Sequence, residues 1–120
     1  IQATSPLIKF IDIIQGTKRF EKNNYDSLFS GYYTKKFFWK NQKNKLLALN
    51  YNYQKRPMRQ NHNKSIVENG AFYIFNIRKF FKYKSRLFKK IGVQIMPEKR
   101  SIEIDNTNDL NNVRKILKKN

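Results

Sequence analysis

The stretch Glu68–Phe75, which reads ENGAFYIF, carries the clearest structural signal in this chain. Its last five residues, Ala71–Phe75, are all apolar and follow an Asn-Gly pair. A short apolar run bounded by turn residues is typical of a buried β-strand. The pair Asn69-Gly70 predicts a tight turn before that strand and a close approach of the backbone to a ligand. A short helix is expected directly afterwards, over Ile77–Tyr83.

The segments on either side alternate between strand and helix. The chain opens with a strand end over Ile1–Thr4, after which Ser5 is expected to cap a helix and Pro6 to occupy its first turn. Apolar residues at helical spacing carry this helix to about Phe20. Further strands are expected over Asp26–Tyr33, Ile91–Met96 and Ser101–Ile104, and a closing helix over Asn108–Lys119. This order favours one α/β domain.

The middle of the chain departs from the alternation. Two apolar arms, Phe37–Lys40 and Leu46–Tyr51, flank a polar turn and predict a β-hairpin. Tyr53–Glu68 is polar, contains Pro57 and shows no periodicity, which indicates a long connection. The hairpin and this connection interrupt the alternation, so we expect residues 34–67 to form an excursion from the sheet. Long ordered connections usually serve a function.

Composition narrows the class of protein. The 120 residues include 26 Lys or Arg and 8 Asp or Glu, a net charge of +18, yet 39% are hydrophobic and 15% aromatic, which favours a folded domain over a disordered tail. No apolar run approaches the roughly 18 residues that a membrane span requires. The chain has no Cys, which excludes disulfides and thiolate metal sites and is compatible with a reducing compartment. The single histidine, His62, argues against histidine-based catalytic or metal sites.

The charge raises the alternative of a basic nucleic-acid-binding module, since cations gain affinity for phosphates through counterion release. The Lys residues are scattered, however, and no compact basic helix, zinc-finger spacing or RNP-type aromatic pair accompanies them. A solvated Lys-rich surface therefore explains the charge more simply, and nucleic acid is the less favoured partner.

Acidic residues cluster in SIEIDNTNDL, residues 101–110 of this basic chain. On a strand, Glu103 and Asp105 would project from the same face about 6–7 Å apart. Paired carboxylates suit Mg²⁺, which prefers oxygen ligands and substrate phosphates. The alternative is structural: Asp109 caps the last helix and Glu103 pairs with a surface Lys.

A second polar group lies in KRPMRQ, Lys55–Gln60, upstream of ENGAFYI. Arg59 can hold a carboxylate or phosphate through two hydrogen bonds, or it is simply a solvated loop charge. Tyr73 on the apolar strand suits a protein core as well as a pocket. The chain contains no Gly-rich phosphate loop and no nucleophile elbow, so it holds at most half of a phosphate-handling site.

Taken together, IQATSPL, KRPMRQ, ENGAFYI and SIEIDNTNDL resemble, in this order, the C-terminal half of the acylneuraminate cytidylyltransferases (CMP-sialic acid synthetases). The resemblance covers nearly the whole chain. It implies the C-terminal part of a Rossmann-like nucleotidyltransferase sheet, with residues 34–67 as a hairpin excursion used for dimerisation and sugar binding. The family's N-terminal CTP-binding segment is absent from these residues, so a fragment inactive by itself is expected.

The activity that this resemblance implies is the transfer of CMP from CTP to a nine-carbon sialic-type sugar acid, with Mg²⁺ as cofactor and pyrophosphate as the second product. The implied protein is a cytoplasmic homodimer without a membrane partner. Within the same reaction class, legionaminate, pseudaminate and ketodeoxyoctonate are alternative sugar acids.

The resemblance also assigns roles to single residues. Glu103 stands where the family has an Asp, which lengthens a metal ligand by one methylene, and Val67 stands where many bacterial members have an Arg. The implied magnesium ligands are Asp105 and Glu103. The implied sugar-acid contacts are Gln2, Lys40, Arg59, Gln60, Asn69, Gly70 and Tyr73.

Overall fold

The computed structural model describes residues 1–118. These residues form three α-helices and five β-strands, which confirms the α/β class. The described chain divides into two compact units. The first contains Ile1–Tyr32 and the residues from Glu68 onward, and the second is Tyr33–Val67. The second unit thus spans nearly the residues expected to form the excursion.

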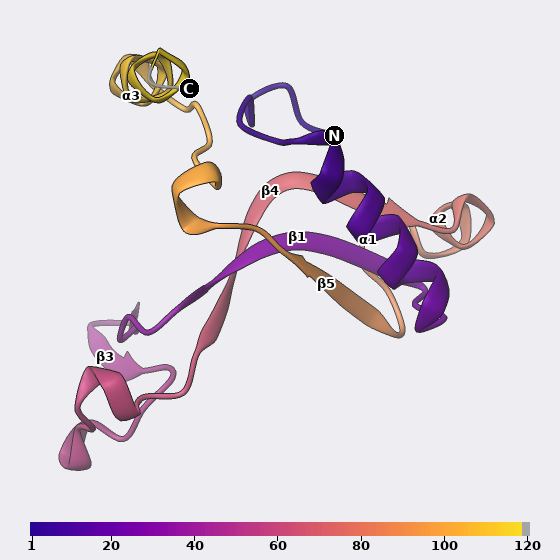
Figure 1. Cartoon of the computed structure of the whole chain (residues 1–120). Coiled ribbons are helices and arrows are strands. Elements are labelled where there is room, and N and C mark those ends of the chain that lie inside the picture. The colour runs from indigo at the N-terminus through magenta and orange to yellow at the C-terminus, as the bar shows by residue number, and fades with distance from the viewer. Residues whose placement is uncertain (119–120) are drawn as a thin grey trace. The chain divides into compact units, whose positions relative to one another are not determined.

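A three-stranded sheet in the order β4-β1-β5 organises the first unit. The central strand, β1 (Ser27–Thr34), pairs in parallel with β5 (Ile91–Ile95), with Ser27 opposite Ile91. On its other side lies β4 (Ser65–Phe75), which runs in the opposite direction (Figure 1). The sheet is therefore mixed, and the predicted strands over 26–33 and 91–96 are confirmed with small shifts of their ends. The strand predicted over 71–75 also forms, but it begins earlier, at Ser65, inside the stretch expected to be a long connection.

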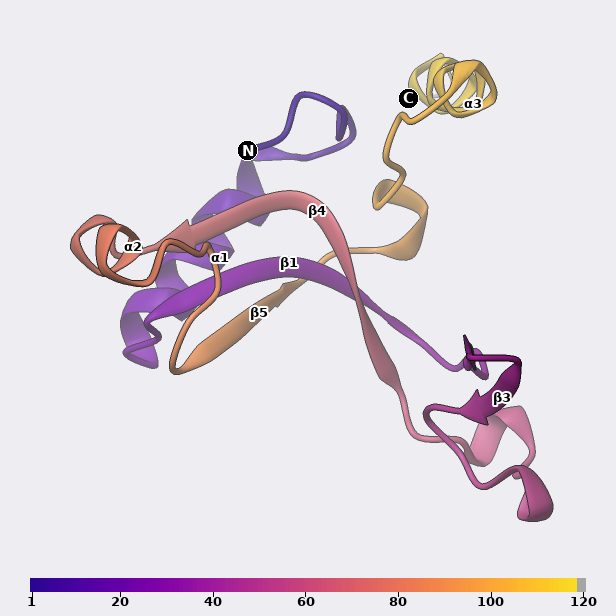
Figure 2. The same cartoon turned by 180° about the vertical axis from the view of Figure 1, so that it is seen from behind.

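Helix α1 (Phe10–Lys22) covers one face of this sheet, lying in front of β1 and β5 in Figure 1 and behind them in Figure 2. A Cβ atom on Gly16 would lie 3.0 Å from Phe72 Cε2, so the missing side chain lets the helix approach β4 closely. The buried core consists of Leu28, Ala71, Phe72 and Met96, with Ile8, Ile13, Phe20, Tyr25 and Ile74 packed against it.

The start of α1 differs from the prediction that Ser5 and Pro6 begin the helix. The helix begins at Phe10, because Asp12 supplies the cap: its carboxylate accepts a hydrogen bond of 2.9 Å from the Lys9 backbone N–H. Ser5 is instead buried ahead of the helix, and its hydroxyl has no hydrogen-bond partner within residues 1–118.

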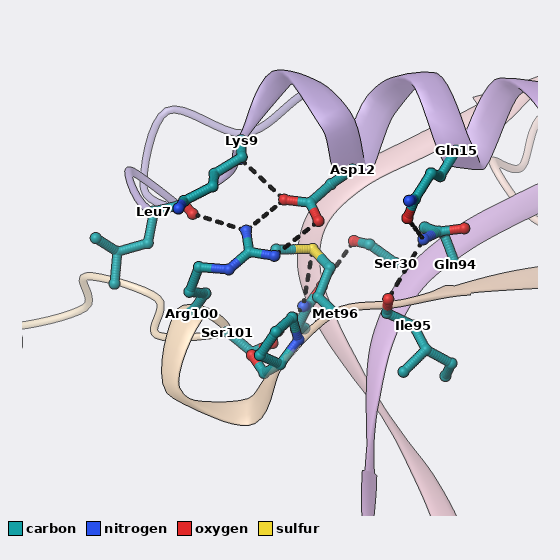
Figure 3. Close-up of polar contacts among 12 residues, drawn as sticks. Leu7, Lys9, Asp12, Gln15, Ser30, Gln94, Ile95, Met96, Arg100 and Ser101 are labelled. Carbon is teal, nitrogen blue, oxygen red and sulfur yellow. Dashed lines mark hydrogen bonds and ion pairs between the residues drawn. The ribbon is translucent and has the colours of Figure 1, made fainter.

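An ion pair between the partly buried Arg100 and the buried Asp12 fixes the same end of α1 to the segment after β5 (Figure 3). Arg100 Nη2 donates to Asp12 Oδ1 over 2.8 Å, Nη1 donates to Asp12 Oδ2, and Nη1 also reaches the Leu7 carbonyl at 3.3 Å. The Arg100 guanidinium lowers the pKa of the Asp12 carboxyl below its usual value, although burial acts in the opposite direction. The pair thereby positions the chain that leads into residues 101–105.

The other two helices agree with the sequence pattern. Helix α2 (Ile77–Tyr83) has the predicted bounds and is capped by Asn76, whose side chain accepts a hydrogen bond from the Lys79 N–H. Helix α3 (Thr107–Leu117) begins with a capping box in which Asp109 takes part, so the structural role considered for that residue is confirmed. The predicted end of α3 at Lys119 lies outside the described residues.

Two predicted strands, 1–4 and 101–104, do not form. The Gln2 N–H donates to the Ala71 carbonyl (2.9 Å), and the Ile104 N–H donates to the Thr4 carbonyl (2.8 Å). Single hydrogen bonds of this kind hold the segments beside one another without making a ladder. They still bring the segments around Gln2 and Ile104 to the Gly70 region of β4.

The predicted turn at Asn69-Gly70 is also wrong, because both residues lie inside β4. Gly70 has φ = 64°, a left-handed conformation that interrupts the strand as at a β-bulge. The Asn69 side chain accepts a hydrogen bond from the Ala71 N–H across this point. The pair therefore bends a continuous strand instead of starting one.

The second unit contains the predicted hairpin, formed by β2 (Trp39–Gln42) and β3 (Lys45–Ala48). Its two-residue turn, Lys43-Asn44, has φ values of 48° and 63°, as a type I′ turn requires. The long connection contains two short 3-10 helices, η1 (Tyr53–Lys55) and η2 (Arg59–Asn61).

Asn50 ties the second unit together. Its side-chain oxygen accepts from the Phe38 N–H, while its side-chain nitrogen contacts the Lys36 carbonyl, Ser65 Oγ and His62 Nε2 at 2.9–3.2 Å. His62 is buried and its ring centroid lies 4.6 Å from that of Phe37. The only histidine of the chain therefore has a packing role.

Among residues 1–118 the structure contains no helix that is long and apolar enough to cross a membrane.

Candidate functional site

Three residues from widely separated parts of the chain meet on the first unit. A Cβ atom built on Gly70 would lie 2.6 Å from Gln2 Oε1 and 3.4 Å from both carboxylate oxygens of Glu103. Glycine is required here twice, since its φ is positive and its neighbours leave no space for a side chain. We call Gln2, Gly70 and Glu103 the Gly70 surface.

The Gly70 surface is rich in hydrogen-bond acceptors. Thr4 Oγ1 donates to Glu103 Oε1 over 3.2 Å, which orients that carboxylate. Gln2 Oε1 is buried and has no donor within residues 1–118. A buried amide oxygen of this kind is normally paired. The arrangement therefore suits a ligand that brings donors or a cation, such as sugar hydroxyls or a hydrated Mg²⁺.

Tyr73, also on β4, belongs to a neighbouring group with Glu68 and Arg86. Its hydroxyl donates to Glu68 Oε1, and the Arg86 guanidinium carbon lies 4.3 Å from the centre of its ring. Burial, followed by the Glu68 carboxylate, raises the pKa of Tyr73 to about 12, and the charge of Glu103 acts in the same direction. Tyr73 therefore remains a neutral phenol at physiological pH and can donate a hydrogen bond but not act as a base.

Asn69, unlike its neighbour Gly70, is buried and fully used inside the protein. Its side-chain oxygen lies 2.6 Å from Ser30 Oγ, and its nitrogen donates to Ser101 Oγ (2.8 Å) and Met96 Sδ (3.5 Å). Asn69 thus joins β4 to β1 and to the segment after β5. Its contact with a sugar stays a prediction from the resemblance.

Three further predicted contacts belong to the second unit. Arg59 and Gln60 are exposed on η2, where the Gln60 backbone carbonyl accepts a hydrogen bond from Lys35 Nζ. Lys40 is exposed on β2. The contact of these three residues with a sugar acid stays a prediction.

The magnesium prediction places Glu103 and Asp105 on one face of a strand, but residues 101–105 do not form a β-strand. Asp105 is exposed and its backbone N–H donates to Asp109 Oδ2 at 3.2 Å. No group of three or more His, Cys, Asp or Glu side chains that could hold a metal occurs in residues 1–118. Mg²⁺ needs only one or two protein carboxylates beside water and substrate phosphates. On the Gly70 surface, the carboxylate oxygens of Glu103 and the side-chain amide oxygen of Gln2 are of the kind that can ligate such an ion.

Sequence reasoning missed Thr4, Glu68 and Arg86. In a regular strand, residues five apart such as Glu68 and Tyr73 point to opposite faces. The positive φ at Gly70, which the Asn-Gly pair signals, breaks the alternation and lets them meet. For Thr4 and Arg86 the sequence contains no comparable signal, because their contacts depend on the paths of irregular segments.

Compared with models of known protein families, the chain matches none.

Proposed function

We propose that this chain is the sugar-acid-binding, C-terminal part of a cytidylyltransferase with a Rossmann-like sheet, acting on a nine-carbon sialic-type acid. One observation supports the proposal above the others. Gln2, Gly70 and Glu103 come from three separate motifs of the resemblance, and the side chains of Gln2 and Glu103 both lie against Gly70. Motifs that matched by accident would have no reason to converge.

The chemistry of the Gly70 surface suits this role. Acceptors such as Gln2 Oε1 and the Glu103 carboxylate would bind sugar hydroxyls. In the reaction, the anomeric hydroxyl attacks the α-phosphorus of CTP, and the bond to pyrophosphate breaks as the bond to the sugar oxygen forms. Bound Mg²⁺ would neutralise charge on the phosphates; Glu103 and Gln2 are its proposed ligands on the Gly70 surface, and Asp105 is the further ligand that the resemblance implies. Such catalysis rests on positioning and needs no nucleophilic side chain.

Isothermal titration with N-acetylneuraminate and Mg²⁺ tests this proposal. The wild-type chain is expected to bind, and Gln2→Leu and Glu103→Gln are each expected to weaken binding roughly tenfold, the effect of losing one strong hydrogen bond. Glu21→Gln, an exposed change on α1, serves as the control for charge and should bind as the wild type does. Equal affinities for all four proteins would contradict the proposal.

Parallel titrations with legionaminate, pseudaminate and ketodeoxyoctonate distinguish the alternative sugar acids. The highest affinity identifies the substrate, and we expect it for the sialic-type acid.

Turnover gives a separate expectation. The 120 residues contain no Gly-rich nucleotide loop, so we expect no pyrophosphate release when they are given CTP, Mg²⁺ and N-acetylneuraminate. Rapid release of pyrophosphate by this chain alone would contradict the expectation that it lacks a CTP-binding segment.

The net charge of +18 supports a second candidate, a basic nucleic-acid-binding module. This function predicts an affinity for single- or double-stranded nucleic acid that falls steeply as salt rises. It gives no role to the acceptors of the Gly70 surface, which would face phosphates of like charge, and we therefore rank it second.

A further inference from the structure

A polar hollow of about 560 Å³ lies beside α1 and β5. Its lining shares no residue with the Gly70 surface and lies entirely in the first unit. We call it the α1–β5 pocket. It is lined by Gln15, Lys18, Arg19, Lys22, Asn23 and Gln94.

Gln94 supplies the first observation that points to a ligand. The side chain is 4% exposed, and its nitrogen donates to Gln15 Oε1 and to the Ile95 carbonyl, both at 3.3 Å (Figure 3). Because a carbonyl only accepts, the Ile95 contact fixes which end of the amide is the nitrogen. The remaining atom, Gln94 Oε1, is buried and has no donor within residues 1–118. Gln94 lines the pocket, and an O–H or N–H group of a molecule bound there would supply the donor that this oxygen lacks.

Three cations supply the second observation. Lys18, Arg19 and Lys22 are exposed on the last two turns of α1, and none of them has an ion-pair partner among the described residues. Lys18 and Lys22 are four residues apart, a spacing at which like charges repel on a helix. An anion in the pocket would relieve this repulsion and accept hydrogen bonds from one edge of the Arg19 guanidinium.

We propose that the α1–β5 pocket binds a small phosphorylated molecule that also carries a hydroxyl donor, such as a sugar phosphate. The phosphate would lie against Lys18, Arg19 and Lys22, and the hydroxyl would donate to Gln94 Oε1. The volume suits such a molecule, since small-ligand sites run from roughly 300 to 1,000 Å³. A nucleic-acid backbone in the same place would engage the cations and leave the buried oxygen unpaired. The inference does not depend on the proposed cytidylyltransferase function.

Titration of the whole chain with three probes tests the pocket: ribose 5-phosphate, inorganic phosphate and ribose. Ribose 5-phosphate is expected to bind at least tenfold more tightly than inorganic phosphate, and ribose without a phosphate should not bind measurably. A result in which phosphate binds as well as ribose 5-phosphate would overturn the proposal, because the Gln94 acceptor would then contribute nothing.

Variants separate a pocket from a general effect of charge. Lys18→Gln with Lys22→Gln should weaken ribose 5-phosphate binding at least tenfold, and Gln94→Met should abolish the preference over inorganic phosphate. A second pair, Lys115→Gln on α3 with Lys118→Gln at the C-cap of that helix, has the same net charge as the first pair and should bind as the wild type does. If the α3 pair weakens binding as much as the pocket pair, the affinity reflects overall charge and the proposed site is refuted. The exposed lysine pairs keep this comparison valid even if the Gln94 variant does not fold.

Discussion

At the scale of single residues, two positions govern the region of the candidate site. Gly70 permits the contact of Gln2 and Glu103 with β4, and Asp12 anchors Arg100 just before residues 101–105. Neither role follows from residue type alone. The Asn-Gly pair indicated a special backbone conformation, but a strand with a bulge and a turn share that signal. No sequence pattern indicates the ion pair between Asp12 and Arg100, because the two residues are 88 positions apart.

Gly70→Ala is expected to destabilise the protein by about 2 kcal/mol, because alanine is strained at φ = 64° and its Cβ would overlap Gln2 Oε1. Urea unfolding followed by circular dichroism measures the change in the free energy of unfolding. The same substitution should reduce binding of N-acetylneuraminate, since Gln2 must move. A variant as stable as the wild type would show that Gly70 does not have this conformation.

Asp12→Asn is expected to lower the free energy of unfolding at pH 7 by about 2 kcal/mol, because it leaves the partly buried Arg100 without its counter-charge. The pKa of Asp12 is lower in the folded protein than in the unfolded chain, so its contribution is complete above about pH 4 and is lost as the pH falls further. The wild type should thus approach the variant in stability under acid conditions.

Unfolding of both proteins between pH 7 and pH 2 measures this convergence. Glu21→Gln, an exposed change on the same helix, serves as the control and should follow the wild type at every pH. A stability difference between Asp12→Asn and the wild type that stays constant from pH 7 to pH 2 would contradict the role given to the ion pair.

At the scale of elements, the sequence predicts regular structure well where the pattern is local. The α2 helix, the hairpin and the strands β1 and β5 follow from periodicity and turn residues. The failures are the start of α1 and the expected strands over 1–4 and 101–104. The start of α1 is set by the local Asp12 cap, whereas segments 1–4 and 101–104 are held by long-range contacts, such as the Ile104–Thr4 hydrogen bond, which no local pattern encodes. The candidate site depends on those same segments, so its motifs could be found from the sequence but its geometry could not.

Gly16→Val tests the packing of α1 on the sheet. A Cβ atom at this position already lies 3.0 Å from Phe72 and 3.3 Å from Ile74 Cδ1, so the larger side chain must push the helix away from β4. We expect a loss of about 1–3 kcal/mol in the free energy of unfolding. Thr17→Val places the same side chain at the next, exposed position and should have a much smaller effect. Similar losses for both variants would contradict the close helix–sheet contact.

At the scale of the whole molecule, the second unit has a surface that its own fold does not cover. Large apolar side chains are exposed on or near the hairpin: Trp39, Leu46, Leu47, Leu49, Tyr53 and Met58. Surfaces of this kind mark interaction sites. They support the proposal that residues 34–67 serve in dimerisation, with a second copy of the chain as the partner.

Leu46→Lys is therefore expected to convert a dimer into a monomer, because it replaces an apolar residue, 67% exposed at the proposed interface, with a charged one. Light scattering after gel filtration measures the mass of the wild type and the variant. Asn111→Lys, an exposed change on α3 outside the hairpin, adds the same charge and should remain dimeric. A monomeric wild type would remove dimerisation from the proposal.

The central claim is that the Gly70 surface binds a sialic-type sugar acid. Nuclear magnetic resonance of the ¹⁵N-labelled chain, titrated with N-acetylneuraminate and Mg²⁺, tests it most directly by locating the bound sugar. We predict shifts of the backbone amide signals of Gln2, Gly70, Tyr73 and Glu103, with those of α3 unchanged. Saturating sugar that leaves these four signals in place, or that shifts only residues elsewhere, would contradict the account.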